Sequence, residues 1–321
     1  MPSPSPFWSV MIPVYNSIEF LAKTLESVLC QDPGPDHMQI EVVDGHSTRD
    51  EPSALVRRVA GDRVAVFRHA EPLPMFANWN SCIQRARGEW VHILHSDDLV
   101  LPGFYSRLRE SLAPRPDLGA AFVRWSIIEE NGDVLETAAL ERPEAGVLED
   151  GLERLSTHQR VQFPAMVVRK SAYTAVGGFS SELVYALDWE MWSRIAARYP
   201  IWYEPEMLAC YRSHPGSETF RLRRANLECQ DHGKCMAVVA RRLPAHSAIR
   251  DQLAASSIQV ARDLFVYRQV GAGYRQLWIT LGIRSSPAVI WSMVSMLGWS
   301  AIQACRARLR KFGFAPPRPV A

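Results

Sequence analysis

The sequence lacks the short motifs that mark several large classes of protein. It contains no Gly-rich phosphate loop and no Gly-x-Gly-x-x-Gly, which argues against P-loop and Rossmann nucleotide sites. It has six cysteines but no Cys-x-x-Cys pair, so we expect free thiols in a cytosolic protein rather than disulfides. Internal repeats and low-complexity tracts are also absent. What is present is a chain of 321 residues with 47% hydrophobic residues, enough to bury the core of one large or two small domains.

Two further features look like signals but predict little. The N-terminal segment MPSPSPFW has neither a basic region nor an apolar core, so we expect a short flexible lead and no secretory signal. Cys229, His232 and Cys235 recur every three residues in a predicted helix. Because no fourth ligand is in view, we interpret them as ordinary helix residues rather than a metal site.

Charge is distributed unevenly along the chain, although the net charge is only +2. Residues 221–321 hold 16 lysines and arginines against 4 acidic residues, whereas residues 1–220 hold 20 against 30. This split predicts a domain over residues 1–220 and a helical, basic region over residues 221–321, joined by a linker at Glu218–Arg224. The basic region has no recognisable nucleic-acid motif, so no nucleic-acid partner is expected.

The C-terminal region contains a stretch without charge, Ser285–Cys305, which is long enough to span a bilayer but rich in serine. Four cations follow it directly, at positions 306, 308, 310 and 311. An interfacial helix with a basic tail would bind an anionic membrane surface through residues 285–321. The alternative is a buried helix that packs on the domain formed by residues 1–220 or on a second subunit.

Three short apolar runs in the N-terminal half end in polar clusters. Phe7–Val14 ends in Tyr15 and Asn16, Ile40–Val43 ends in Asp44, and Trp90–Leu94 ends in His95-Ser96-Asp97-Asp98. We interpret the runs as buried parallel strands, which places the clusters at one edge of a sheet, where ligands of open α/β sheets bind. Ser17 is expected to cap the helix between the first two strands.

The rest of the chain predicts further strands and helices. Strands are expected at Arg63–Arg68, Val161–Arg169, Ile201–Tyr203 and Met207–Tyr211, and a hairpin with an Asn131-Gly132 turn joins Ala120–Ile128 to a strand from Val134. Helices are expected at Phe76–Ala86, from Pro102 to Leu112 and at Leu187–Tyr199.

Several motifs in this order resemble a family 2 glycosyltransferase. They are SVMIPVYN, EVVDGHSTRD, ANWN, ARGEWVHILHSDD, VGGF, LDWEMWSR and CYRSH, and they cover roughly residues 7–220. The resemblance implies an α/β protein of the GT-A fold, with a doubly wound mixed sheet flanked by helices. It also implies a nucleotide-sugar donor and a divalent metal.

The resemblance places a Mn²⁺ or Mg²⁺ site at the HSDD segment. Asp97 matches the last Asp of the family's Asp-x-Asp motif, but the first Asp is His95 here. His95 is therefore a candidate ligand that favours Mn²⁺, or else a buried, hydrogen-bonded histidine. Asp98 would ligate through water or contact the donor sugar. Arg212 and His214 would meet the diphosphate or the metal, the alternative being a surface Arg–carboxylate pair.

Asp188 is implied as the catalytic base that takes the proton of the acceptor hydroxyl. It lies at the start of the LDWEMW helix, where the helix dipole lowers its basicity, so we expect burial to offset that effect. The alternative is a helix N-cap, and Glu190 is the fallback base. Trp189 and Trp192 follow a helical pattern and are expected in the core.

The remaining donor-site candidates follow from the first three strand ends. Tyr15 would stack on the base, and Asp44 would accept a hydrogen bond from uracil N3–H. Asn16, Glu19 and Asn78 would hold ribose or sugar hydroxyls, while Pro13 sets the backbone shape.

Together these features predict an inverting, metal-dependent glycosyltransferase that uses a UDP-linked sugar and a saccharide or lipid-linked acceptor. Its expected setting is surface polysaccharide assembly, peripheral on the inner face of the cytoplasmic membrane. Two alternatives stay open. A nucleotidyltransferase would need a Gly-rich basic loop after the first strand, which VYNS lacks. A degenerate nucleotide-binding scaffold is compatible with His95 in place of Asp.

Overall fold

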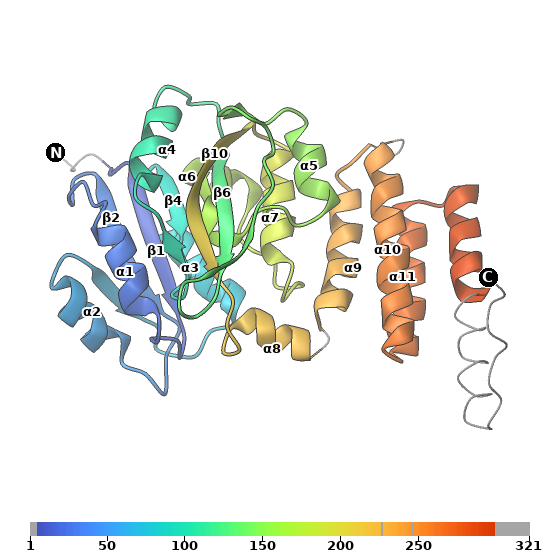
Figure 1. The fold of residues 1–321 in the computed structure, drawn as a ribbon, viewed down its shortest axis with the longest axis horizontal. Coiled ribbons are helices and arrows are strands. Elements are labelled where there is room, and N and C mark those ends of the chain that lie inside the picture. Colours follow the sequence, from blue (N-terminus) through green and yellow to red (C-terminus); the bar gives the residue numbers. More distant parts are fainter. Residues whose placement is uncertain (1–4, 226, 245–246, 299–321) are drawn as a thin grey trace. The chain divides into compact units, whose positions relative to one another are not determined.

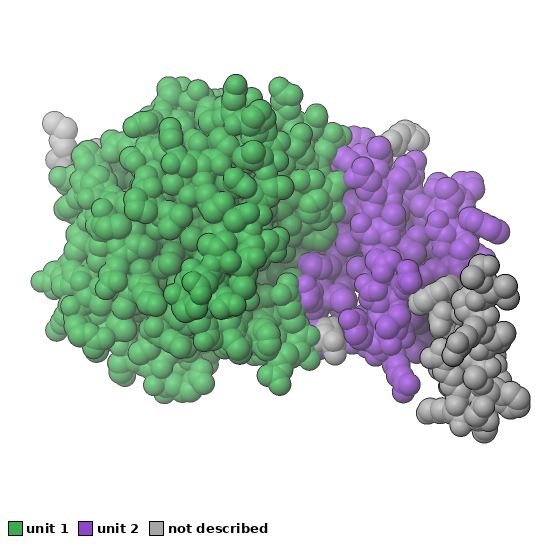
Figure 2. Space-filling model, viewed as in Figure 1, with its two compact units in different colours: residues 1–224 green, residues 225–321 purple. Residues whose placement is uncertain are grey.

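The structure is a computed structural model that describes residues 5–225, 227–244 and 247–298. The chain divides into two compact units, residues 1–224 and 225–321 (Figure 2). The predicted linker at Glu218–Arg224 is wrong, because these residues form helix α8. Leu222 of this helix is buried, which explains why the segment packs instead of forming a flexible connection.

The first unit is built on a ten-stranded mixed sheet of order β3-β2-β1-β4-β9-β6-β10-β5 (Figure 1). Strands β1 (Trp8–Val14), β2 (Met38–Asp44), β3 (Ala65–Arg68) and β4 (Trp90–Ile93) run parallel. Every residue of β1, β2 and β4 is buried. Parallel strands covered on both faces read as continuous apolar runs, and this is why the sequence predicted them.

Helices α1 (Leu21–Leu29), α2 (Pro52–Ala60) and α3 (Met75–Arg85) connect these strands. Helix α2 was not predicted, although Pro52 at its first turn and its buried Leu55 and Val56 are typical helix features. The expected cap at Ser17 is wrong, because α1 begins four residues later and has no side-chain cap. Ser17 bonds to a neighbouring loop instead.

The second half of the sheet is mixed because β9 (Met166–Arg169) lies antiparallel between β4 and β6 (Ala120–Ile128). Short strands β5 (Leu99–Val100) and β8 (Gly146–Val147) pair with β10. Strand β7 (Val134–Thr137) completes the predicted hairpin with β6, which is confirmed. The predicted strand Val161–Arg169 is only partly correct, since Phe163–Ala165 is a 3₁₀ helix and Pro164 cannot donate to a ladder.

Two predicted strands near residue 205 are one strand, β10 (Ile201–Arg212). Its register with β6 shifts between Glu204 and Met207, around Pro205. Proline lacks a backbone N–H and interrupts the ladder without ending the strand. The remaining helices of this unit are α4 (Phe104–Leu112), α5 (Gly151–Thr157), α6 (Lys170–Val176) and α7 (Leu187–Ala196).

The second unit is helical, as predicted. It contains α9 (Leu227–Ala240), α10 (Ala248–Val266), α11 (Val270–Ile283) and a further helical stretch at residues 287–298. In the part of the chain that the structure describes, none of the helices combines the length and hydropathy needed to cross a membrane. The end of the predicted membrane-binding segment 285–321, from residue 299 onward, lies outside the described residues.

Candidate active site

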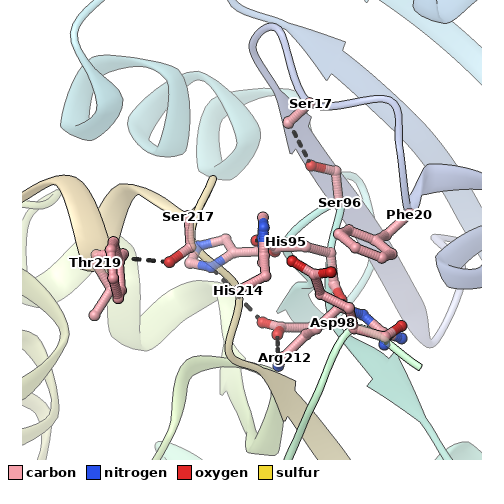
Figure 3. A network of polar contacts seen from close by, with 12 residues as sticks. Ser17, Phe20, His95, Ser96, Asp98, Arg212, His214, Ser217 and Thr219 are labelled. Carbon is pink, nitrogen blue, oxygen red and sulfur yellow. Dashed lines mark hydrogen bonds and ion pairs between the residues drawn. The ribbon is translucent and has the colours of Figure 1, made fainter. Parts of the chain in front are cut away.

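The ends of the parallel strands meet at one edge of the sheet, as the sequence predicted. Strand β1 pairs in parallel with β2 on one side and β4 on the other. The Asn16 backbone N–H donates to Ser47 Oγ at 2.9 Å, joining the loops after β1 and β2. The Oγ atoms of Ser17 and Ser96 lie 2.8 Å apart and join the loops after β1 and β4 (Figure 3). Three polar loops therefore form one connected surface.

A cluster of potential metal ligands follows β4. One ligand atom each from His95, Asp97 and Asp98 lies within 4.8 Å of the others. His214, which follows β10, places its Nε2 3.1 Å from Asp97 Oδ2. Figure 3 shows His95, Asp98 and His214 gathered at this edge. The tertiary structure thus brings together the three residues predicted as metal ligands, two of them more than a hundred positions apart in sequence.

Asp98 is the most deeply buried member of this cluster. Its Oδ1 accepts the backbone N–H of Arg212 at 2.9 Å, while its Oδ2 has no hydrogen-bond partner. Burial and, after it, the charge of Asp97 raise the pKa of the Asp98 carboxyl well above its usual range. The raised pKa means that ionising Asp98 costs free energy at this place. A bound cation would offset that cost, because its positive charge compensates the two adjacent carboxylates.

The His95 ring contacts two aromatic side chains, which also contact each other. Its centroid is 5.0 Å from that of Trp79, in a stacked arrangement, and 4.3 Å from that of Phe163. Burial lowers the pKa of His95 to about 4, so the imidazole is neutral near pH 7. Its Nε2 is buried without a hydrogen-bond partner, but the side chain as a whole is 22% exposed, so the alternative of a buried, hydrogen-bonded histidine is wrong.

The donor set fits a divalent cation. Two carboxylates and neutral imidazole suit Mn²⁺, and the carboxylates alone suit Mg²⁺. The unpartnered atoms, Asp98 Oδ2 and His95 Nε2, are acceptors that a cation would satisfy. Elsewhere in the described ranges no other group of three or more histidine, cysteine or acidic side chains has this arrangement. Cys229, His232 and Cys235 accordingly form no such group.

Arg212 is fully buried and shapes the metal-ligand loop. Its Nε donates to the Asp97 carbonyl at 2.8 Å, and one guanidinium nitrogen donates to the Glu129 and Glu130 carbonyls at 2.8 and 2.9 Å. The guanidinium also lies 4.6 Å from the ring centroid of Phe20. The alternative of a surface ion pair is wrong, because Arg212 is only 1% exposed. The bond to the Asp97 carbonyl fixes the backbone position of Asp97.

Asp188 lies in the first turn of α7 and is buried. Its Oδ1 accepts the backbone N–H of Trp189 at 2.8 Å, and its Oδ2 accepts the side-chain amide of Gln159 at 2.5 Å. Burial raises the pKa of Asp188 to about 7, although these hydrogen bonds oppose the shift. The N-cap alternative is wrong, because the cap residue is Ala186. The expected burial of this carboxylate is observed.

The surroundings of Asp188 connect it to the metal-ligand cluster. Trp189 and Trp192 are buried in the core, as predicted. The ring of Trp192 contacts Phe163 at a centroid distance of 5.6 Å, and Phe163 in turn contacts His95. Glu190, the fallback base, is engaged with Arg194 at 2.7 Å. A continuous aromatic core therefore joins the helix that carries Asp188 to the His95 loop.

Asp44 at the end of β2 is also buried and bonded on both oxygens. Its Oδ1 accepts the Ser47 backbone N–H at 2.7 Å, and its Oδ2 pairs with Arg68 at 2.8 Å. A nucleotide base would therefore use a second lone pair of this carboxylate. Asn16 has a positive φ of 51° and its Oδ1 accepts the backbone N–H groups of residues 48 and 49. Asn16 is thus engaged in holding two loops together.

The other predicted donor-site residues differ in accessibility. Asn78 on α3 donates to the Val43 carbonyl at 3.2 Å, while its buried Oδ1 has no hydrogen-bond partner. Tyr15 is 49% exposed and Glu19 is exposed, so both are free to meet a nucleotide at this edge. Pro13 is buried within β1, consistent with a role in backbone shape only.

Comparison with known proteins decides the family. The model of glycosyl transferase family 2 matches residues 9–173, which is just over half of the chain. The chain belongs to glycosyl transferase family 2. The uncharacterized protein MT1568 of Mycobacterium tuberculosis is 28% identical over 232 residues, covering 68% of this chain and 70% of that protein. The uncharacterized glycosyltransferase MJ1057 of Methanocaldococcus jannaschii is 24% identical over 212 residues, covering 64% and 71%.

Solved structures of glycosyltransferases share the fold of this family 2 member. Residues 1–349 of S. aureus TarS, in complex with UDP-GlcNAc, superpose with a TM-score of 0.63 at 17% identity, covering 91% of this chain and 80% of that one. The mannosyltransferase PcManGT of Pyrobaculum calidifontis, in complex with GDP-Man and Mn²⁺, gives 0.53 at 19% identity, covering 94% and 88%. The predicted GT-A fold is therefore confirmed, and the protein is a glycosyltransferase.

Sequence reasoning missed several residues that shape this glycosyltransferase site. Arg68 could have been found, since it ends β3 directly beside Asp44 in the parallel register. Trp79 lies in the ANWN motif but carried no sign that it stacks on His95. Gln159 lies outside every motif that signalled the family, and nothing in the sequence ties it to Asp188.

Proposed function

We propose that the enzyme is an inverting glycosyltransferase in which Asp188 is the catalytic base. The observation that carries this proposal is the buried Asp188 carboxylate, whose pKa is raised to about 7. A general base is most effective when its pKa is near the working pH. Asp188 therefore combines a deprotonated population at neutral pH with enough basicity to accept a proton.

The reaction follows from this placement. The acceptor hydroxyl oxygen attacks the anomeric carbon from the side opposite the diphosphate, and a new C–O bond forms as the bond to the diphosphate oxygen breaks. Asp188 takes the hydroxyl proton during this step, so the nucleoside diphosphate leaves with the electron pair of the broken bond. Attack from the opposite side inverts the anomeric centre. A base in this role contributes about 10²–10⁴-fold in rate.

The residues proposed to hold a divalent cation are His95, Asp97 and His214, with Asp98 beside them. The ion, when bound, would offset the negative charge that develops on the leaving diphosphate. Arg212 fixes the Asp97 backbone, which orients the carboxylate toward the cluster. The imidazole in place of the family's first Asp favours Mn²⁺, the ion in the PcManGT complex.

We infer a UDP-linked donor and a saccharide or lipid-linked acceptor. The TarS complex contains UDP-GlcNAc, whereas the PcManGT complex contains GDP-Man. Asp44 supports the uridine assignment, because this buried carboxylate at the end of β2 keeps a further lone pair on each oxygen, which would accept the N3–H of uracil. Asn78 Oδ1 and the exposed Tyr15 would contact the ribose and the base.

One experiment separates this function from its alternatives. Purified protein is assayed for nucleotide-sugar hydrolysis across UDP-, GDP- and dTDP-linked sugars, with Mn²⁺ or with EDTA. We expect release of UDP that requires Mn²⁺ and that falls by at least 10²-fold in Asp188→Asn. Release of pyrophosphate from a nucleoside triphosphate would indicate a nucleotidyltransferase. Tight UDP binding without turnover of any donor would indicate a degenerate scaffold.

We also propose that the C-terminal unit holds the enzyme on an anionic membrane surface, on the inner face of the cytoplasmic membrane, where surface polysaccharides are assembled. The exposed face of α11 carries Val270, Tyr274 and Trp278, spaced four residues apart, with Trp278 76% exposed. In the helical stretch 287–298, Trp291 is 72% exposed. Tryptophan and tyrosine are typical of membrane interfaces.

Charge supports a lipid rather than a protein partner for these aromatic residues. No acidic residue follows Asp263 anywhere in the sequence, whereas arginines recur from Arg268 to Arg318. Insertion of apolar side chains and attraction of cations to anionic lipid are each weak, but together they give stable membrane binding. Each cation near the membrane surface adds about 1 kcal/mol.

Flotation with anionic liposomes tests this attachment. The protein should float at low salt and sink at high salt, and Trp278→Ser should weaken flotation while leaving donor hydrolysis unchanged. The control is Leu135→Ser on β7, which removes an apolar side chain that is 56% exposed from the first unit. Flotation that persists at high salt would mean insertion. No flotation, with loss of the folded state on deletion of residues 285–321, would mean that the segment packs internally.

A further inference from the structure

We propose that Gln159 is a positioning residue for Asp188, holding one oxygen of the carboxylate and stabilising it before and after it accepts a proton. This inference rests on the proposed function, because it concerns the residue assigned there as the base. Gln159 lies between α5 and the 3₁₀ helix at Phe163–Ala165, outside every motif that identified the family. It reaches Asp188 from across 29 positions of sequence.

The geometry fixes the orientation of the carboxylate. Asp188 Oδ1 accepts the N–H of the next residue of its own helix at 2.8 Å. Asp188 Oδ2 accepts Gln159 Nε2 at 2.5 Å, so the two oxygens are held by donors from two separate segments. Rotation of the carboxylate about its Cβ–Cγ bond would break both bonds. The group is thereby fixed in one orientation, with one lone pair on each oxygen left for a substrate hydroxyl.

A side-chain amide suits a partner that changes protonation state. When Asp188 is ionised, the Gln159 NH₂ group donates to Oδ2, as observed. When Asp188 has accepted a proton on Oδ2, the new O–H rotates about the Cγ–Oδ2 bond toward Gln159, and a 180° rotation of the amide brings Oε1 into place to accept it. A cationic partner would stabilise only the ionised state, and an apolar partner would stabilise neither. Glutamine is therefore able to stay bonded throughout the reaction.

The charged groups of the surrounding elements do not replace this interaction. The shift of the Asp188 pKa is caused by burial and, in the opposite direction, by its backbone hydrogen bonds and the Gln159 hydrogen bond. The groups on the adjacent elements are Glu190 paired with Arg194 on α7, Arg154 and Arg160 paired with Glu141, and Glu153 and His158 beside them. Gln159 is thus the side chain whose replacement changes the protonation of Asp188.

Two substitutions of Gln159 should shift the pH dependence in opposite directions. Gln159→Leu removes a hydrogen bond that is stronger to the carboxylate than to the carboxylic acid, so the Asp188 pKa rises and the acidic limb of UDP-sugar hydrolysis moves up by about one pH unit. Gln159→Arg adds a cation beside the carboxylate, so the limb moves down by about one unit or more. Both substitutions should lower kcat several-fold with little effect on the KM for the donor, because neither Gln159 nor Asp188 is proposed to contact the nucleotide.

A titration that needs no turnover gives a second measurement. In protein labelled with ¹³C at the aspartate carboxyl carbons, the Asp188 resonance is assigned as the one absent from Asp188→Asn. Its midpoint should move up in Gln159→Leu and down in Gln159→Arg. The matched control is Ser156→Ala, which breaks a 2.9 Å hydrogen bond between α5, the helix just before Gln159, and Ser193 on α7, the helix that carries Asp188. This control should leave the midpoint and the pH profile unchanged.

The outcomes separate this inference from the proposed function. If Asp188→Asn abolishes transfer but both Gln159 variants keep the wild-type midpoint, the positioning role is wrong and the base assignment stands. Equal shifts in the same direction for Leu and Arg would also overturn it, because they would indicate a general packing defect. Should Asp188→Asn retain full transfer activity, the base assignment itself fails, and the role of Gln159 fails with it.

Discussion

Replacing Asp188 with asparagine tests whether burial raises the pKa of this carboxylate. The test measures how the free energy of unfolding depends on pH in wild type and in the variant. The Asp188 pKa is raised from 3.8 to about 7 in the folded protein. A folded-state pKa above the unfolded value contributes stability that is fully present below about pH 4 and lost as the pH rises to about 7. Above that pH the folded protein must carry a buried charge, whereas asparagine stays neutral.

The magnitude follows from the shift. About three pKa units, at about 1.4 kcal/mol each, correspond to about 4 kcal/mol between pH 4 and pH 8. This is an upper value, because water penetration and local relaxation reduce the cost of a buried charge. We therefore expect the unfolding free energy of Asp188→Asn, relative to wild type, to increase by about 2–4 kcal/mol over this range, since the variant lacks the ionisation.

The assay is urea unfolding followed by tryptophan fluorescence at pH 4, 5, 6, 7 and 8, for wild type and Asp188→Asn in parallel. Groups other than Asp188 titrate in both proteins, so they cancel in the difference between the two curves. A difference that grows between pH 4 and 7 and is constant above pH 7 supports the reasoning. A difference independent of pH would show that Asp188 titrates near its ordinary value, and the base assignment would lose its main support.

Three other predictions concern the strand-end loops. Asp97→Asn should lower kcat by several orders of magnitude and EDTA should abolish turnover of wild type, whereas full activity in EDTA would exclude the metal role. Wild type should bind UDP more tightly than GDP in calorimetry, and Asp44→Ala should reduce that preference; equal affinity of wild type for the two would contradict the uridine assignment. Arg212→Lys should lower the free energy of unfolding, measured in urea, by about 2–4 kcal/mol. Lysine cannot replace the planar guanidinium group, which donates to three backbone carbonyls. An unchanged midpoint would show that those bonds contribute little.

The sequence by itself determined the parallel half of the sheet and the edge at which the site lies. Strands β1, β2 and β4 are buried on both faces, so each contains a short and mostly apolar run that can be seen in the sequence. The polar residues that follow each run must then lie at one edge. The order of the motifs, from SVMIPVYN to CYRSH, indicated the family. Each motif is a short stretch of neighbouring residues, so it can be recognised without knowing the fold.

Where local patterns were weak, the sequence was a poorer guide. Helix α8 was taken for a linker because acidic residues become fewer and arginines more frequent there, yet buried Leu222 anchors the helix. Strand β10 was divided in two at Pro205, because a local pattern cannot show that the ladder with β6 resumes after the shift in register. Both errors concern segments whose structure depends on a distant partner.

Only the tertiary structure decided how the functional side chains are paired. His214 meets Asp97 across 117 positions, and Gln159 meets Asp188 across 29. Arg212 resembled a ligand contact in sequence, but its guanidinium is engaged with backbone carbonyls from two loops. Periodicity and motif spacing describe neighbours along the chain, whereas hydrogen bonds and burial depend on which segments the sheet brings together. The protonation of Asp188 near neutral pH is therefore a property of the folded site, set by burial and opposed by its hydrogen bonds.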